Sequence, residues 1–306
     1  MTIKVFGHKS PDTDATASAI VMAWYLTNIK EKPATPYVLG TPNTEAEFVL
    51  KHWGVDCPEI LEDVQDDEDV VIVDTNNLQE LPDNINNANV LQIVDHHKLV
   101  AGLETKSPAE ITIRPMASTA SVIGPMMMKQ WDQVPSEIKG LILSCIISDT
   151  LEFRSPTTTE CDKQMAANLA AELEVDINEL ATAMFAAKSD VSHFSDAELI
   201  RLDSKKYEVG GTNFRVSVLE TTTPQTVLDR KESLVSTFES VQTEDGVDQV
   251  LLFVVDILKE EATLLVPNGL VKTVAEKSFD CTVEGDTVVL PGIVSRKKQI
   301  IPNLKV

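Results

Sequence analysis

The chain has 306 residues, of which 43% are hydrophobic and 24% are charged, and its formal net charge is −22. This composition is typical of a globular protein with one large domain or two ordinary ones, and no apolar run approaches the roughly 20 residues that span a bilayer. A nonspecific nucleic-acid binder carries a basic face, so the negative charge argues against DNA or RNA as a partner.

The cysteines are few and far apart in the chain, at positions Cys57, Cys145, Cys161 and Cys281. They form no Cys-x-x-Cys pair, which argues against a zinc ribbon or a disulfide framework. The N-terminal residues enter a strand-like run directly and show no secretion signal. We therefore expect reduced thiols, a cytoplasmic location and no membrane partner.

Short apolar runs in the N-terminal half are typical of buried parallel strands, at Ile3–Phe6, Val70–Val73 and Val90–Val94. Polar side chains follow each of these runs: His8, Asp12 and Asp14 follow the first, Asp74 the second, and Asp95, His96 and His97 the third. Open α/β sheets bind ligands at the carboxyl ends of their strands. We therefore expect these side chains to lie close together.

Helical patterns separate and follow these runs, at Ala15–Ile29, Glu45–Trp53, Ser118–Trp131, Glu137–Thr150, Thr157–Glu174 and Ile177–Ala187. The fourth is apolar on nearly every side, which predicts a buried helix, and Asp149 lies at its end. A buried carboxylate must be paired or bound to a metal. Two simpler interpretations are also possible. Asp12 or Asp14 could cap the first helix, and Asp149 could be a helix cap or form a salt bridge with Arg154.

The pattern changes after a polar stretch at residues 188–195, which has the composition of a linker. We predict an α/β protein of two domains: a metal-binding domain at residues 1–188 with a mainly parallel sheet flanked by helices, a hinge linker at 189–195, and a smaller mixed α/β domain at 196–306. Near the C-terminus, Ser295–Gln299 contains a basic run that is either a solvated face or an anion-binding turn.

The clustered side chains predict a metal site. Imidazoles with carboxylates suit Mn²⁺, Fe²⁺ or Co²⁺ better than Mg²⁺ or Ca²⁺. The carboxylates exceed what one ion needs, so we expect two ions about 3.5–4 Å apart, which generate a hydroxide near neutral pH and clamp a phosphoryl group. Neighbouring side chains in extended backbone point apart, so we assign His96 to a metal and His97 to the substrate, with Asp95 orienting an imidazole.

With these motifs the sequence resembles the family II, manganese-dependent inorganic pyrophosphatases of the Asp-His-His (DHH) phosphoesterase superfamily. The resemblance covers essentially the whole chain. It rests on Gly7–Ala15, Val73–Asn76, Asp95–His97, Ser148–Thr150 and Ser295–Gln299, of which the last two distinguish this branch.

The resemblance implies hydrolysis of inorganic pyrophosphate at two Mn²⁺ ions per subunit, with Co²⁺ able to replace Mn²⁺ and Mg²⁺ arriving with the substrate. One ion would be held by His8, Asp12, Asp74 and Asp149, and the other by Asp14, Asp74, His96 and Asp149. His97, Lys205, Arg296 and Lys297 would bind the phosphates, and His97, Asp14, Asp74 and Asp149 would be catalytic. The family places its lysine in an Asp-x-Lys pattern, which favours Lys205 over Lys206. The resemblance also implies closure of the second domain and a homodimer formed through the N-terminal domain.

Two other functions compete with this one. A phosphodiesterase of the same superfamily, acting on short oligonucleotides or cyclic dinucleotides, usually carries a Gly-Gly-Gly-His type signature, whereas this chain has Gly210-Gly211 without a following His. A non-catalytic metal or anion sensor usually loses ligands, whereas the clusters here are complete.

Overall fold

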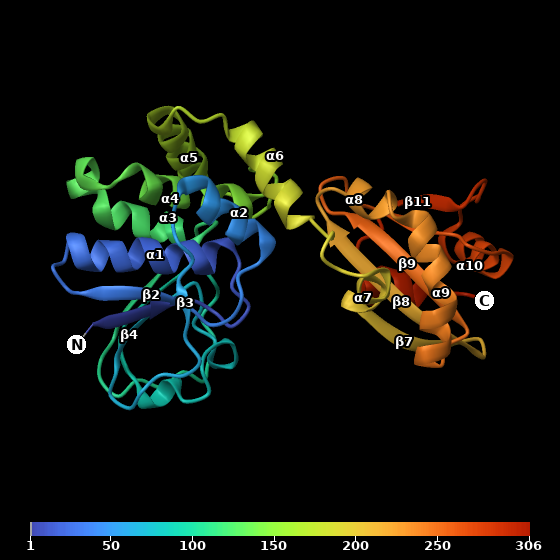
Figure 1. The fold of residues 1–306 in the computed structure, drawn as a ribbon, viewed down its shortest axis with the longest axis horizontal. Coiled ribbons are helices and arrows are strands. Elements are labelled where there is room, and N and C mark those ends of the chain that lie inside the picture. The colour runs from blue at the N-terminus through green and yellow to red at the C-terminus, as the bar shows by residue number, and fades with distance from the viewer. Residues whose placement is uncertain (1) are drawn as a thin grey trace. The chain divides into compact units, whose positions relative to one another are not determined.

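The computed structural model describes residues 2–306, and the chain divides into two compact units, Met1–Ala187 and Lys188–Val306. Each unit has its own β-sheet flanked by helices (Figure 1). This confirms the predicted α/β fold with a mainly parallel N-terminal sheet and a smaller mixed C-terminal domain. Among residues 2–306, no helix combines the length and apolar character that crossing a membrane requires.

The N-terminal sheet is parallel throughout. Its strands are β1 (Ile3–Phe6), β2 (Ala34–Val38), β3 (Glu59–Ile60), β4 (Asp69–Val73), β5 (Asn89–Asp95) and β6 (Glu110–Ile113). They lie in the order β3-β2-β1-β4-β5-β6, and every neighbouring pair is parallel. The strand order reverses between β1 and β4. Such a switch point opens a crevice at the carboxyl ends of the two strands, where open α/β sheets bind their ligands.

The two faces of this sheet are covered differently. Helices α1 (Thr13–Asn28) and α3 (Thr119–Ile123) contact the strands on one face. Helices α2 (Thr44–Trp53) and α4 (Ser136–Thr150) pack against α1, α5 (Glu160–Leu173) packs against α4, and α6 (Ile177–Lys188) adds side chains to the same hydrophobic core. The opposite face packs against loops and the short 3₁₀ turns η1 (Leu78–Glu80) and η2 (Ile85–Asn87). Helix α4 is buried on nearly all sides, as predicted, and Figure 1 shows it close to α1.

The prediction of one continuous helix over Ser118–Trp131 was wrong. The structure has the short helix α3, followed by a 3₁₀ segment, η3, at Gly124–Gln133. Pro125 stands at the start of that segment and lacks the N–H that a continuing α-helix would use. Residues 77–88 contain the short 3₁₀ turns η1 and η2.

The C-terminal sheet is mixed. Its strands are β7 (Ser204–Val209), β8 (Thr212–Thr221), β9 (Gln249–Asp256), β10 (Glu261–Leu265) and β11 (Thr287–Pro291), in the order β11-β10-β9-β8-β7. Strands β8 and β9 are parallel, and the other neighbouring pairs are antiparallel. Strand β7 has exposed, charged side chains at Lys205, Lys206 and Glu208 and partly buried ones at Tyr207 and Val209.

Helices cover both faces of the C-terminal sheet. Helices α7 (Asp196–Leu202) and α9 (Lys231–Asp245) pack on one face, and α10 (Gly269–Phe279) packs on the other. The short helix α8 (Gln225–Leu228), the π-helical turn η4 (Arg296–Ile300) and α11 (Ile301–Asn303) complete this unit. The Arg230 side chain donates to the carbonyl oxygens of Val191 and Phe194, both at 2.8 Å, so part of residues 189–195 is held against this unit.

Candidate metal centre

Three neighbouring strands end at the centre of the site. His8 follows β1, Asp74 follows β4 and His96 follows β5. The Asp74 carboxylate lies between the two imidazoles: Oδ2 is 3.4 Å from Nε2 of His8, and Oδ1 is 3.3 Å from Nε2 of His96. Since Asp74 is only 2% exposed and offers one oxygen to each side, it can connect two adjacent cation positions.

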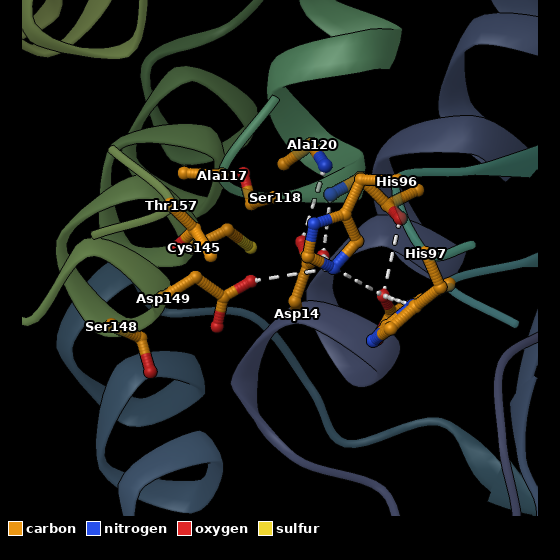
Figure 2. A network of polar contacts seen from close by, with 12 residues as sticks. Asp14, His96, His97, Ala117, Ser118, Ala120, Cys145, Ser148, Asp149 and Thr157 are labelled. Atoms are coloured by element: carbon orange, nitrogen blue, oxygen red, sulfur yellow. Dashed lines mark hydrogen bonds and ion pairs between the residues drawn. The ribbon is translucent and has the colours of Figure 1, made fainter. Parts of the chain in front are cut away.

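The remaining candidate ligands come from the ends of two helices. Asp12 and Asp14 lie at the start of α1, and Asp149 lies in the last turn of α4. Asp12 Oδ1 is 3.8 Å from His8 Nε2, whereas Asp14 Oδ2 and Asp149 Oδ2 are 3.9 and 4.0 Å from His96 Nε2. Figure 2 shows Asp14 and Asp149 directed toward His96.

The six residues predicted as metal ligands therefore lie together. Groups of three offer ligand atoms within 4.8 Å of one another: His8, Asp12 and Asp74 form one, Asp14, His96 and Asp149 a second, and Asp74, His96 and His97 a third. A cavity of about 170 Å³ opens onto most of these side chains. The capping reading of Asp12 also holds, because its Oδ1 accepts from the Ala15 N–H at 3.0 Å. Arg154 pairs with Glu152 at 2.7 Å.

Local backbone features bring the loops together. Gly7 allows the loop that carries His8 to pass close to α1, since a Cβ at this position would lie 2.8 Å from Cβ of Ala15. Asp74 has φ 59°, a left-handed conformation that aspartate adopts more readily than most residues. Strained backbone of this kind is found mainly where the surrounding structure holds it, often at functional sites.

The fully buried Asp14 carboxylate is held by donors from α3 and α1. It accepts from the backbone N–H groups of Thr119 and Ala120, at 2.6 and 3.1 Å, and from the Ser18 hydroxyl at 2.9 Å. The Thr119 hydroxyl donates to Asp74 Oδ1 at 3.1 Å. These bonds offset the cost of burying the carboxylates and fix their orientation.

The site concentrates like charges that need a cation. Burial, together with the charge of Asp74, raises the pKa of Asp14 to about 7. Burial lowers the pKa values of His8 and His96, but the neighbouring carboxylates outweigh it and raise each to about 9. Burial would raise the pKa of Asp74, but hydrogen bonds from His8 and His96 hold it well below its usual range. The raised pKa values mean that the cluster binds protons when no metal ion is bound. Its imidazole nitrogens and carboxylate oxygens are donors that suit Mn²⁺, which would replace these protons.

Both histidines of the Asp-His-His motif are fixed through Nδ1. Nδ1 of His96 lies 3.1 Å from the Met116 carbonyl oxygen, which can only accept, so Nδ1 carries hydrogen and Nε2 faces the carboxylates. This is the orientation of metal-ligating histidines. Nδ1 of His97 lies 2.9 Å from Asp95 Oδ1, which also accepts from the N–H groups of both histidines. Asp95 therefore orients the His97 ring.

The two histidine rings do not point apart as predicted. Their centroids are 4.2 Å apart, and His97 Nδ1 lies 3.7 Å from Asp74 Oδ1. The physical reason is that β5 ends at Asp95, so the alternation of an extended strand does not continue through the histidines. His97 still differs from His96 in exposure, at 54% against 15% for the side chains.

The predicted phosphate-binding cations Lys205, Arg296 and Lys297 lie in the second unit, where they line a cavity of about 510 Å³. The Arg296 guanidinium donates to the Asp203 side chain at 2.6 Å and to its carbonyl oxygen at 2.7 Å. Lys205 and Lys206 are adjacent in β7, so their side chains leave opposite faces. The Lys206 ammonium donates to the Asp245 carbonyl oxygen, away from the residues that line this cavity.

Sequence reasoning missed two buried carboxylates behind the site. Glu45, in the first turn of α2, is 0% exposed and accepts from the hydroxyls of Thr13 and Ser148. Asp162 is also 0% exposed and accepts from the backbone N–H of Ala117, which lines the site cavity. Acidic residues in the first turn of a helix are common, so the sequence offered no signal that set these two apart.

Comparison with known proteins follows the same division of the chain. Residues 2–148 match the DHH family, N-terminal domain, and residues 182–306 match the DHHA2 domain. The chain is 35% identical over 300 residues to the probable manganese-dependent inorganic pyrophosphatase of Staphylococcus saprophyticus, covering 98% of this chain and 96% of that protein. It is 36% identical over 310 residues to the manganese-dependent inorganic pyrophosphatase of Methanocaldococcus jannaschii, covering 98% and 97%. The chain belongs to the manganese-dependent inorganic pyrophosphatase family.

Solved structures agree with this membership. A crystal structure of a Methanococcus jannaschii protein assigned to the family II inorganic pyrophosphatases matches with a TM-score of 0.64 and 35% identity, covering 98% of both chains. An exopolyphosphatase-related protein from Bacteroides fragilis shares the fold, with a TM-score of 0.51 and 14% identity over 98% of this chain and 89% of that one. Membership in the manganese-dependent pyrophosphatase family confirms the resemblance seen in the sequence motifs.

Proposed function

We propose that the chain hydrolyses inorganic pyrophosphate to two phosphates at a dinuclear manganese centre. The observation that carries this proposal is the position of Asp74, with one carboxylate oxygen near the His8 imidazole and the other near that of His96. The names of the relatives support pyrophosphate as the substrate.

In this proposal each ion has one imidazole and shares two bridging carboxylates. His8 and Asp12 would hold one ion, Asp14 and His96 would hold the other, and Asp74 and Asp149 would be shared by both. The two groups of ligand atoms on either side of Asp74 support this division. When bound, the ions lower the pKa of a shared water and clamp the phosphoryl group. Co²⁺ replaces Mn²⁺ in this role, and Mg²⁺ arrives with pyrophosphate.

The substrate phosphates bind to His97, Lys205, Arg296 and Lys297. Arg296 presents a planar fork that matches phosphate oxygens, whereas the lysines act as point charges. Pyrophosphate gains negative charge on the leaving phosphate as the bridging bond breaks, and positive groups at that position stabilise the transition state. Since Asp95 holds Nδ1 of His97, Nε2 is the atom that hydrogen-bonds or protonates a phosphate oxygen.

Residues 1–188 supply the metal centre, residues 196–306 supply the cations, and residues 189–195 act as the hinge that brings the cations to the metals. Closure excludes water, and opening releases the phosphates. We further infer a homodimer formed through the N-terminal unit, to which the exposed Ile111 on the edge strand β6 lends support. The free cysteines support a reducing cytoplasm.

The test is phosphate release by metal-stripped protein to which Mn²⁺, Co²⁺ or Mg²⁺ is added separately. Pyrophosphate should be hydrolysed fastest with Mn²⁺ or Co²⁺, and a cyclic dinucleotide should be hydrolysed far more slowly. The variant Asp149→Ala should stay folded and lose the activity. The proposal is wrong if the dinucleotide is the better substrate or if Asp149→Ala keeps the wild-type rate.

A further inference from the structure

A buried carboxylate lies behind the metal centre without facing it. Glu45 is 0% exposed in the first turn of α2, and its Oε2 accepts from the Thr13 hydroxyl at 2.9 Å and from the Ser148 hydroxyl at 2.7 Å. Both donors are themselves buried, at 1% and 4% exposure. One oxygen of Glu45 thus connects the start of α1 with the last turn of α4.

The two donors are the chain neighbours of candidate metal ligands. Thr13 stands between Asp12 and Asp14, and Ser148 directly precedes Asp149. Figure 2 shows Ser148 and Asp149 at the end of α4, with Asp149 directed toward His96 and Ser148 directed away from it. A displacement of either hydroxyl would therefore move a carboxylate of the metal centre.

The distances around His96 show that this connection bears on the spacing of two carboxylates. Asp14 Oδ2 and Asp149 Oδ2 approach the same atom, Nε2 of His96, at 3.9 and 4.0 Å, and they come from different helices. A metal site works when its ligands are held within about 0.5 Å of the required geometry by locked neighbours. Asp14 has its own donors from α3, whereas the link through Glu45 of α2 connects the start of its helix with the last turn of the helix of Asp149.

Burial of a carboxylate is costly unless it is hydrogen-bonded, and an apolar side chain at this position would take an acceptor away from the hydroxyls of Thr13 and Ser148. The hydrogen bonds make the carboxylate tolerable and give it a directional role that an apolar residue could not fill. Glu47 lies two positions further along the same helical turn and is exposed. Among the described residues 2–306, Glu47 makes no hydrogen bond to Thr13 or Ser148, so it serves as a matched control.

We propose that Glu45 is a positioning residue for the metal centre, which fixes the spacing of Asp14 and Asp149 through its hydrogen bonds to Thr13 and Ser148. This inference rests on the proposed function, because it assigns those two aspartates to a manganese ion. Glu45 touches neither metal nor substrate, and its effect reaches the reaction through the ligands alone.

The test is a titration of metal-stripped, folded protein with Mn²⁺, followed by calorimetry and by the electron paramagnetic resonance of the bound ion. The variant Glu45→Ala should weaken Mn²⁺ binding by about 10-fold, the lower end of the range found when direct partners of metal ligands are removed, because Glu45 acts through the neighbours of the ligands. The variant Glu45→Gln keeps an oxygen that accepts from both hydroxyls and should recover most of the affinity. The control Glu47→Ala should match the wild type.

A second variant covers the case in which Glu45→Ala does not fold. Ser148→Ala removes one donor and leaves the carboxylate in place, so it should weaken Mn²⁺ binding less than Glu45→Ala does. In the double variant Glu45→Ala/Ser148→Ala the two effects should not add, because both remove the same bond. The KM for pyrophosphate at saturating Mn²⁺ should change little, since three of the four proposed phosphate-binding residues lie in the other unit and Asp95 holds the fourth, His97.

The inference is overturned if folded Glu45→Ala, or folded Ser148→Ala, binds Mn²⁺ with the wild-type affinity and gives the wild-type resonance spectrum. A lower melting temperature with unchanged Mn²⁺ binding would also overturn it, since that would show a purely structural role. The proposed function fails separately, if wild-type protein binds Mn²⁺ but does not hydrolyse pyrophosphate, and in that case the titrations still decide the role of Glu45.

Discussion

The metal centre and the basic cavity are built in opposite ways. Asp14 and Asp74 are 1% and 2% exposed and are held by backbone and hydroxyl donors, whereas Lys205 and Lys297 are exposed. The first region gathers carboxylates whose mutual repulsion requires a cation. The second gathers cations around one partly buried guanidinium, that of Arg296.

The difference indicates which steps each region controls. Buried, hydrogen-bonded ligands keep their geometry before a metal arrives, so the first region should determine metal affinity and the chemical step. Exposed lysines exchange their hydration water for phosphate oxygens easily, so the second region should determine how tightly the phosphates bind. Variants in the two regions should therefore have separable effects.

The largest effect is expected from Asp74→Asn. Asparagine tolerates the left-handed backbone at φ 59° and keeps the size of the side chain, so the fold should persist. The substitution removes the charge that both imidazoles face. Metal catalysis contributes several kcal/mol, so kcat should fall by about a thousandfold or more. The rate of phosphate release at saturating Mn²⁺ measures this effect. A fall in kcat of less than tenfold would contradict the claim that the metal centre controls the chemical step.

Metal binding should depend strongly on pH. A protonated imidazole has no lone pair for a metal, and the pKa values of His8 and His96 are raised to about 9, so each ion must displace a proton below that pH. Affinity should therefore rise by about tenfold per pH unit between roughly pH 6 and pH 8 for the ion beside His8, and more steeply below about pH 7 for the ion beside His96, because the pKa of its ligand Asp14 is raised to about 7. Calorimetry in buffers of different ionisation enthalpy should detect the released protons. A flat profile would contradict the assignment of imidazole ligands.

A smaller effect is expected from Arg296→Ala, a substitution in the basic cavity. Charge-assisted hydrogen bonds contribute about 1.5–3 kcal/mol, so kcat/KM for pyrophosphate should fall about 10- to 100-fold while the Mn²⁺ affinity stays at the wild-type value. Arg296→Lys should recover little, because an ammonium lacks the planar fork. Equal losses in metal affinity and in kcat/KM would show that the two regions are not separable.

The smallest effect is expected from a matched pair of neighbours, Lys205→Ala and Lys206→Ala. Lys205 lines the basic cavity, whereas Lys206 donates to the Asp245 carbonyl oxygen. Lys205→Ala should raise the KM for pyrophosphate by about tenfold, and Lys206→Ala should leave it unchanged. Steady-state kinetics at saturating Mn²⁺ make the comparison. The opposite ranking would place the wrong lysine at the phosphate.

The strands of the first unit and their polar termini could be predicted because buried parallel strands are short apolar runs with abrupt ends. The rule that ligands bind at the carboxyl ends of such strands then places His8, Asp74 and His96 in one site. Asp149 was found because a carboxylate at the end of an apolar helix needs a partner.

The parts that the sequence did not reveal depend on tertiary contacts. The two histidine rings lie close together because β5 ends at Asp95, and strand ends cannot be placed to one residue from a pattern. The role of Glu45 depends on hydroxyl donors that are 32 and 103 positions away in the chain. Strand β7 alternates only over its last four residues, where Tyr207 and Val209 are the partly buried ones, and so short a run did not identify it.

The most direct measurement of the central claim is an anomalous difference map at the manganese absorption edge, from crystals soaked in Mn²⁺. The account predicts two peaks about 3.5–4 Å apart, one beside the His8 imidazole and one beside that of His96, with Asp74 between them. A single peak, or peaks remote from Asp74, would contradict it.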